Sequence, residues 1–171
     1  MQNALSLLEN GFLNDQKPQA WADLGCGSGL FTLALNKILP GESTIYAVDK
    51  NISSFRIRDF PKDALIIPVE TDFIHDALSI EPIDGILMAN SLHFVKDKSR
   101  FLEKMKTLFR NEPVFLIVEY DTDRPNPWVP FPMSFLKLKT LFTSLGFRQV
   151  TKLSEYPSRY NSGTIYSAKI V

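Results

Sequence analysis

The sequence is short of cysteine, of net charge and of long apolar runs, and each shortage narrows what the protein can be. Cys26 is the one cysteine among 171 residues, which excludes an internal disulfide and a multi-cysteine metal site. Basic and acidic residues number 19 each, so the zero net charge disfavours nucleic-acid binding through bulk charge. No apolar run approaches the roughly 18 residues that would cross a membrane. The first six residues also lack the features of a signal peptide, and we expect a cytoplasmic protein with no membrane partner.

The length predicts a single domain over 1–171, and 44% hydrophobic residues are enough for its core. Strand-like apolar segments alternate with segments of helical periodicity, which favours an α/β fold with a mainly parallel sheet. Strands are expected at 19–24, 43–48, 65–69, 83–89, 114–118, 147–153 and 160–171. The last two are joined by a turn at 154–159 with no helix between them, so we expect them to pair antiparallel. Pro68 indicates that the third strand is an edge strand, and the nearly all β-branched or aromatic fifth strand is expected to be central.

Helices are predicted where apolar residues recur three or four positions apart between capping or breaking residues. The expected helices are 4–13 within an N-terminal lead-in (1–18), the segment between Gly29 and Pro40, 101–109, and 135–145 with Gly146 as its C-terminal cap, and weaker ones at 52–60 and 73–78. The segment 121–132 holds four prolines and cannot be regular structure. Loops of that length in a compact domain tend to be functional, so we expect it on the substrate side.

The most informative segment is Ala22-Asp23-Leu24-Gly25-Cys26-Gly27-Ser28-Gly29, at the junction of the first strand and the next helix. Glycines there let the backbone adopt positive φ and approach a ligand closely, and the helix start offers free N–H groups. A tight turn alone would explain one glycine but not three alternating ones. The spacing Gly-x-Gly-x-Gly also differs from the Gly-x-Gly-x-x-Gly fingerprint of dinucleotide-binding proteins.

An acid two residues before three alternating glycines resembles the first motif of the class I S-adenosylmethionine-dependent methyltransferases. That family has a Rossmann-like three-layer αβα sandwich with a seven-stranded, mostly parallel sheet in the order 3-2-1-4-5-7-6, strand seven being antiparallel. The five strands and terminal hairpin predicted above match it. The resemblance implies methyl transfer from S-adenosylmethionine, with S-adenosylhomocysteine as product. It also implies cofactor contacts from Asp23, Gly25, Cys26, Gly27 and Gly29. Cys26 has no evident neighbouring base, so we interpret it as a small buried side chain and not as a nucleophile.

Two further acids fit the same cofactor. Asp49 ends the second predicted strand about 20 residues after Gly29, where a carboxylate can accept hydrogen bonds from two ribose hydroxyls. By resemblance, Asp49 binds the ribose and Lys50 lies against the adenine. Asp72 accepts from the adenine amino group, and Phe73 packs on the ring. The alternatives are helix-capping roles for both aspartates and a core position for Phe73.

The fourth predicted strand ends in Asn90-Ser91-Leu92-His93 at the same sheet edge. The resemblance implies that the backbone near Asn90 holds the methionine amino group and that His93 faces the methyl group. His93 is therefore a candidate general base, and the alternative is a packed, inert histidine beside two residues that cap a helix near Val95. Asn-Pro-Pro-Tyr and Asp-Pro-Pro-Tyr motifs of nitrogen-directed nucleic-acid methyltransferases are absent. We therefore expect a small-molecule acceptor and no nucleic-acid partner.

Tyr120 and the loop 121–132 follow the fifth strand and are predicted to face the acceptor. Tyr120 is a second catalytic candidate, Trp128 could form an apolar wall, and Arg124 could pair with an acidic substrate group. The alternatives are that Trp128 plugs the sheet end and that Arg124 pairs with an aspartate of its own loop. Only about 20 residues precede the glycine loop, so a second subunit in a homodimer, a mobile lid or a large partner substrate could complete the pocket.

Two other functions stay open at this point. One is a catalytically silent methyltransferase-like module that binds a cofactor or a partner. The other is a nicotinamide-dependent oxidoreductase, which the glycine spacing and the terminal hairpin disfavour.

Overall fold

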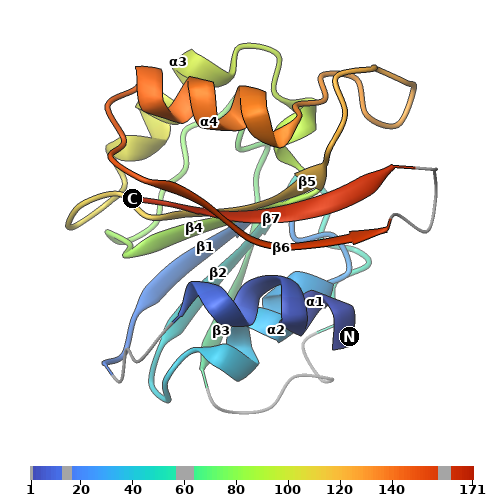
Figure 1. Cartoon of the computed structure of the whole chain (residues 1–171). Coiled ribbons are helices and arrows are strands. Elements are labelled where there is room, and N and C mark those ends of the chain that lie inside the picture. The colour runs from blue at the N-terminus through green and yellow to red at the C-terminus, as the bar shows by residue number, and fades with distance from the viewer. Residues whose placement is uncertain (1, 13–16, 57–63, 158–162) are drawn as a thin grey trace.

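The computed structural model describes residues 2–12, 17–56, 64–157 and 163–171 (Figure 1). Its centre is a seven-stranded sheet in the order β3-β2-β1-β4-β5-β7-β6. The strands are β1 (Ala20–Leu24), β2 (Thr44–Asp49), β3 (Leu65–Glu70), β4 (Gly85–Ala89), β5 (Phe115–Tyr120), β6 (Val150–Pro157) and β7 (Thr164–Ile170). Strands β1 to β5 pair in parallel, and β7 pairs antiparallel with both β5 and β6. The predicted strand order, the edge position of β3 and the antiparallel hairpin are confirmed.

Helices cover both faces of the sheet, and the molecule has three layers (Figure 1). The helices are α1 (Gln2–Leu8), the short 3-10 helix η1 (Glu9–Gly11), α2 (Leu30–Ile38), the 3-10 helix η3 (Leu92–Phe94), α3 (Lys98–Lys106) and α4 (Phe135–Ser144). Neighbouring residues of β1 point to opposite faces, so Trp21 joins the core beneath α1 and α2, and Ala22 joins the core beneath α3 and α4. Gly85 in β4 leaves the space that the Trp21 ring fills. Residues 115–119 of β5 are buried, as a central strand requires.

The strongly periodic helices are confirmed; of the two weaker ones, 73–78 is wrong, and the described part of 52–60 is not helical. Residues 51–56 form turns, because the side chains of Asp49 and Asn51 accept nearby backbone N–H groups and compete with a helix. The rest of the predicted 52–60 helix lies outside the described residues. After β3, residues 73–75 form a turn in which Asp72 accepts the N–H of His75 at 3.1 Å. No helix starts at Val95 either: it follows η3, and α3 begins at Lys98 with Asp97 as its N-cap.

The terminal hairpin differs from its prediction in where the first strand lies. Strand β6 begins at Val150 and continues to Pro157, so the turn expected at 154–159 starts later. A bulge between Lys152 and Ser154 shifts the register and lets the strand continue to pair with β7. Gly146, expected to cap the preceding helix, has a φ of 88° just after α4, which confirms that prediction.

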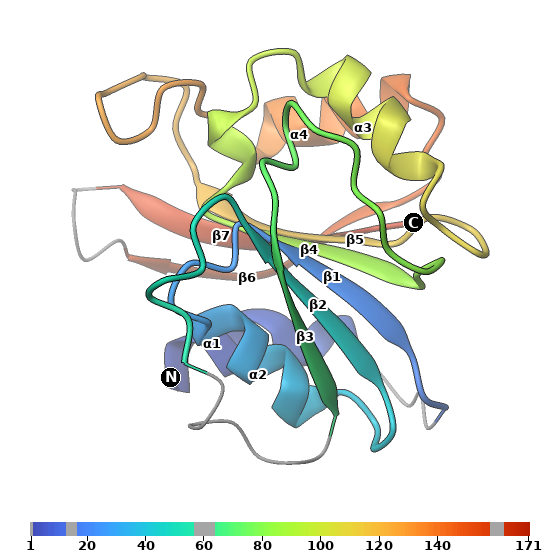
Figure 2. The ribbon, with the colours of Figure 1, turned by 180° about the vertical axis from the view of Figure 1, so that it is seen from behind.

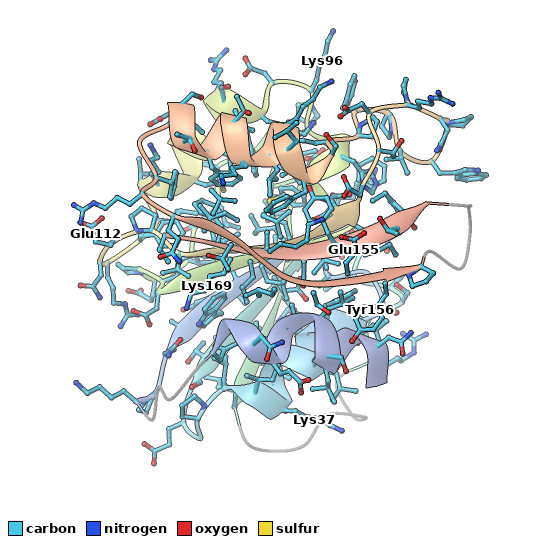
Figure 3. The ribbon with its side chains drawn as sticks, in the orientation of Figure 1. Lys37, Lys96, Glu112, Glu155, Tyr156 and Lys169 are labelled. Carbon is cyan, nitrogen blue, oxygen red and sulfur yellow. The ribbon has the colours of Figure 1, made fainter. Side chains whose placement is uncertain are left out.

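The parallel strands end at one edge of the sheet, where the segments after β1, β2 and β5 gather (Figure 2). This carboxyl edge is the usual ligand site of open α/β sheets. Two hollows of about 430 and 500 Å³ lie at the opposite edge of the sheet, and Glu112 lines both of them. Figure 3 shows Glu112 on the far side of the molecule from Tyr156 of β6. Within the described ranges, no helix is both long enough and apolar enough to span a membrane.

Candidate active site

The loop between β1 and α2 is shaped by three glycines in left-handed conformations. Gly25, Gly27 and Gly29 have φ angles of 85°, 52° and 92°, a region that residues with side chains rarely adopt. A Cβ atom at Gly25 would also lie 2.5 Å from the Cβ of Ser91, whose hydroxyl donates to the Leu24 carbonyl oxygen at 2.5 Å. At Gly27 a Cβ would meet no atom within 4 Å. Gly25 is therefore required by packing, and Gly27 borders open space.

Asp49, at the end of β2, is bonded to this glycine loop. Its Oδ2 accepts the Gly27 N–H at 2.9 Å, and its Oδ1 accepts the Asn51 N–H at 3.1 Å. Each carboxylate oxygen keeps a free lone pair for a further donor. The structure thus brings Asp49 and the glycine loop together. Residues 51–56, the described segment directly after Asp49 and Lys50, form no helix that Asp49 could cap.

Lys50, next to Asp49, and Cys26, next to Gly27, are also predicted to contact the cofactor, and they differ in solvent accessibility. Lys50 is exposed. Cys26 is buried in a small cluster with Ala47 and Phe55, and this burial raises the pKa of its thiol. The thiol is therefore held in its protonated form, in agreement with the interpretation of Cys26 as a small packed side chain.

Asp23 joins β1 to α2, the two elements that flank the glycine loop. It is only 1% exposed, and its Oδ2 accepts a hydrogen bond from the Thr32 hydroxyl of α2 at 2.6 Å. Its Oδ1 is buried and has no hydrogen-bond partner among the described residues. Burial raises the pKa of Asp23 to about 7, the Thr32 hydrogen bond opposes that rise, and the negative charge of Asp49 adds to it. Asp23 thus links β1 to α2 at the cost of a partly unsatisfied carboxyl group.

Asp72 and Phe73 lie in the turn after β3. Asp72 accepts a backbone N–H of that turn at 3.1 Å, and its Oδ2 lies 2.9 Å from Nδ1 of the exposed His75. The hydrogen bond with His75 lowers the pKa of Asp72. Phe73 is buried, with its ring centroid 6.0 Å from that of Phe101 and an edge atom 3.8 Å from where a Gly25 Cβ would be. Both residues have structural partners, and Phe73 also borders the glycine loop.

Asn90, directly after β4, combines two costly features. Its φ is 55°, and its backbone N–H donates to the Val118 carbonyl oxygen at 2.8 Å. Its side-chain Oδ1 is buried and has no hydrogen-bond partner among the described residues. A left-handed backbone at a residue other than glycine and an unsatisfied buried acceptor each cost free energy, and such features cluster at ligand sites.

His93 is buried in η3 and is held by a residue that sequence reasoning missed, Glu119 of β5. The His93 Nδ1 lies 2.8 Å from Glu119 Oε2, and the His93 backbone N–H donates to Glu119 Oε1 at 3.0 Å. The two side chains are 4% and 2% exposed. The available signal in the sequence was a carboxylate inside an otherwise apolar strand, since a buried charge needs a partner.

A second missed residue, Lys98, fixes the loop 121–132 beside η3. Its ammonium group donates to the carbonyl oxygens of Val95 at 2.8 Å and of Phe131 at 2.7 Å. The Phe131 N–H in turn donates to the His93 carbonyl oxygen at 3.0 Å. Burial lowers the pKa of Lys98, an effect that the negative charge of Glu119 opposes. Lys98 lies at the start of the buried face of α3, where its position alone predicts an apolar residue.

Of the other predicted acceptor-side residues, Tyr120 lies close to His93. Its ring centroid is 6.3 Å from that of His93, and the side chain is partly buried. Trp128 is 82% exposed, so it does not plug the end of the sheet.

Arg124 is exposed, and among the described residues it forms no ion pair. The aspartates of the loop pair with other cations: Asp121 lies 3.4 Å from Lys152, and Asp123 lies 3.4 Å from Lys137. The alternative interpretation, in which Arg124 pairs with one of these aspartates, is therefore wrong for this structure.

A sheet of this strand order, with a glycine loop after β1 bonded to an acid at the end of β2, defines the fold of class I S-adenosylmethionine-dependent methyltransferases. A sequence profile of the methyltransferase domain matches residues 2–160, and the chain belongs to that family. No curated protein matches the sequence at a significant level.

Solved structures share the fold at low sequence identity. A SAM-dependent methyltransferase from Aquifex aeolicus is 18% identical, with a TM-score of 0.66 over 100% of this chain and 94% of that one. The 1,6-didemethyltoxoflavin-N1-methyltransferase of Burkholderia thailandensis is 17% identical, with a TM-score of 0.68 over 97% and 75%. DhpI in complex with S-adenosylhomocysteine is 18% identical, with a TM-score of 0.71 over 99% and 84%.

Proposed function

We propose that this chain binds S-adenosylmethionine at the carboxyl edge of β1 and β2 and transfers its methyl group to a small-molecule acceptor. The observation that carries the proposal is the hydrogen bond from the Gly27 N–H to Asp49, which joins the glycine loop to the acid expected to bind the ribose. The Burkholderia enzyme and DhpI, which have the same fold, were both crystallised with S-adenosylhomocysteine, and this supports the same cofactor here.

The residues present fit such a cofactor. Asp49 keeps a free lone pair on each carboxylate oxygen for the two ribose hydroxyls, and the open space at Gly27 admits a ligand close to the backbone. Phe73, which is expected to pack on the adenine, borders Gly25. The buried, unpaired Oδ1 of Asn90 can accept a hydrogen bond from the ammonium group of the methionine part.

Methyl transfer from S-adenosylmethionine requires no covalent catalysis by the protein. The bound cofactor supplies a methyl group already activated by its positively charged sulfur. The chain must hold the acceptor atom in line with that methyl group, and proximity of this kind contributes several kcal/mol to the barrier. His93 and Tyr120 are the catalytic candidates, and Arg124 and Trp128 are the candidates for binding the acceptor. Closure of the pocket by a second subunit stays a prediction. It requires a dimer, and analytical ultracentrifugation measures whether the chain forms one.

Isothermal titration calorimetry with S-adenosylhomocysteine tests the cofactor assignment. We expect Asp49→Ala to weaken binding by about 1–3 kcal/mol, because charge-assisted hydrogen bonds to the ribose are lost. Glu81→Ala, which removes an exposed carboxylate of the same charge, serves as the control and should leave the affinity unchanged.

Two results would contradict the proposal and identify the alternative. Heat of binding with NAD and none with S-adenosylhomocysteine would favour an oxidoreductase. Tight binding of S-adenosylhomocysteine without turnover across oxygen, nitrogen, carbon and sulfur acceptors would favour a silent binding module.

A further inference from the structure

Glu119 and His93 are joined by two contacts and not by a single ion pair. Both oxygens of the carboxylate are used: Oε1 accepts the backbone N–H of His93 at 3.0 Å, and Oε2 lies 2.8 Å from the ring Nδ1. Glu119 therefore fixes the main chain and the ring of the same residue. A packed, inert histidine needs no such double restraint.

This double contact determines which ring nitrogen holds the proton. A carboxylate can only accept hydrogen bonds, so the nitrogen that faces it, Nδ1, must be the donor. In the neutral ring the other nitrogen, Nε2, then has a free lone pair on the side away from Glu119. Among the described residues no hydrogen bond to Nε2 is found.

A buried cation lies near Glu119. Lys98, whose ammonium group donates to the carbonyl oxygens of Val95 and Phe131, is close enough for the negative charge of Glu119 to act on it. Glu119 therefore has an opposite charge nearby in addition to its two contacts with His93.

The side chains around His93 are aromatic and partly open to solvent. The ring centroid of Phe94 lies 4.4 Å from that of His93, and Phe94 is 50% exposed. Phe131, whose N–H bonds to the His93 carbonyl oxygen, is 38% exposed. Large exposed aromatic side chains beside a buried base favour a flat, apolar acceptor that can stack against them.

We propose that Glu119 is a positioning residue that holds the His93 Nε2 ready to take the proton of a hydroxyl group on an aromatic acceptor. This inference rests on the proposed function. The acceptor oxygen gives its proton to Nε2 and uses its own electron pair to form the new bond to the methyl carbon. The electron pair of the broken carbon–sulfur bond stays on sulfur. The imidazolium of His93 then releases its proton to water.

Nitrogen NMR of the two imidazole rings tests the assignment without any acceptor. The wild-type chain should show His93 with its proton on Nδ1 once the ring is neutral, and His93→Asn identifies its signals. In Glu119→Gln the backbone N–H must bond to the amide oxygen, so the amide NH₂ faces Nδ1 and the ring proton moves to Nε2. Glu103→Gln, an exposed change on α3, is the matched control and should leave the tautomer unchanged. A wild-type proton on Nε2, or an unchanged tautomer in Glu119→Gln, would overturn the proposal.

Turnover provides the second measurement, with phenol, 4-methylphenol and 2-naphthol as probes and release of S-adenosylhomocysteine as the readout. General-base catalysis is worth 10²–10⁴-fold, so we expect kcat to fall by about that factor in Glu119→Gln, with the affinity for S-adenosylhomocysteine unchanged. Failure of wild type to methylate any of the three phenols, while it still binds S-adenosylhomocysteine, would overturn the acceptor class. Failure to bind S-adenosylhomocysteine would instead contradict the proposed function itself.

Discussion

The glycine loop and the loop 121–132 lie at the same edge of one sheet, but they are held in different ways. The glycine loop depends on backbone conformation, with three positive φ angles and close packing of Gly25 on Ser91. The loop 121–132 depends on side chains, above all on the hydrogen bonds that Lys98 donates to Val95 and Phe131. The proposed cofactor side of this edge is therefore shaped by the backbone, whereas the proposed acceptor side relies on a few buried polar side chains.

The largest loss of stability is expected at Gly25, where neither the backbone conformation nor the packing admits a side chain. Gly25→Ala combines an unfavourable φ with a clash against Ser91, and we expect a loss of about 3–5 kcal/mol in the free energy of unfolding. Gly27→Ala has an unfavourable φ but open space around it, so its cost should be about 1 kcal/mol. Urea denaturation measures both. Equal losses for the two variants would show that packing on Ser91 does not distinguish them.

Asp23 makes the stability around the glycine loop depend on pH, because it joins β1 to α2 through a titratable group. The folded protein holds the proton up to a pKa of about 7, whereas the unfolded chain releases it near 4. Between these values the folded state binds more protons, so the free energy of unfolding should fall as pH rises. At about 1.4 kcal/mol per pKa unit, the expected fall from pH 4 to pH 8 is about 3–4 kcal/mol relative to Asp23→Asn. Parallel pH profiles of the two proteins would contradict the raised pKa.

Lys98 tests the side-chain half of the comparison. Lys98→Met keeps the length of the buried side chain but removes two hydrogen bonds and the charge near Glu119, and we expect a loss of about 2–3 kcal/mol in unfolding free energy. Hydrogen exchange of the Phe131 amide should accelerate more than that of the Gly27 amide.

Lys96→Met is the control, because Lys96 is exposed at the surface (Figure 3), and it should change stability by less than about 0.5 kcal/mol. If the exchange of the Gly27 amide accelerated as much as that of Phe131, the two loops would not be held independently.

The features that could be predicted from the sequence are those of the backbone, and the ones that could not are contacts between side chains. The alternation of strands and helices, the edge position of β3 and the glycine loop could be derived because they rest on local patterns of apolar residues, proline and glycine. The joining of Asp49 to Gly27 follows from topology, since β1 and β2 are parallel neighbours that end at one edge.

Contacts between side chains that are far apart in the sequence could not be derived from local patterns. Glu119 and Lys98 find their partners through the folded arrangement of β5, η3 and the loop 121–132, which no local pattern encodes. The segment 73–78 and the described part of 52–60 are not helical for a related reason: side chains of Asp49, Asn51 and Asp72 accept nearby backbone N–H groups and close turns instead.

The most direct test of the cofactor site is a crystal structure of the chain with S-adenosylhomocysteine. We expect the adenosine beside the glycine loop, with both ribose hydroxyls on the Asp49 carboxylate and the adenine beside Phe73. Ligand bound instead in the hollow lined by Lys106 and Phe147, at the opposite edge of the sheet, would contradict the account.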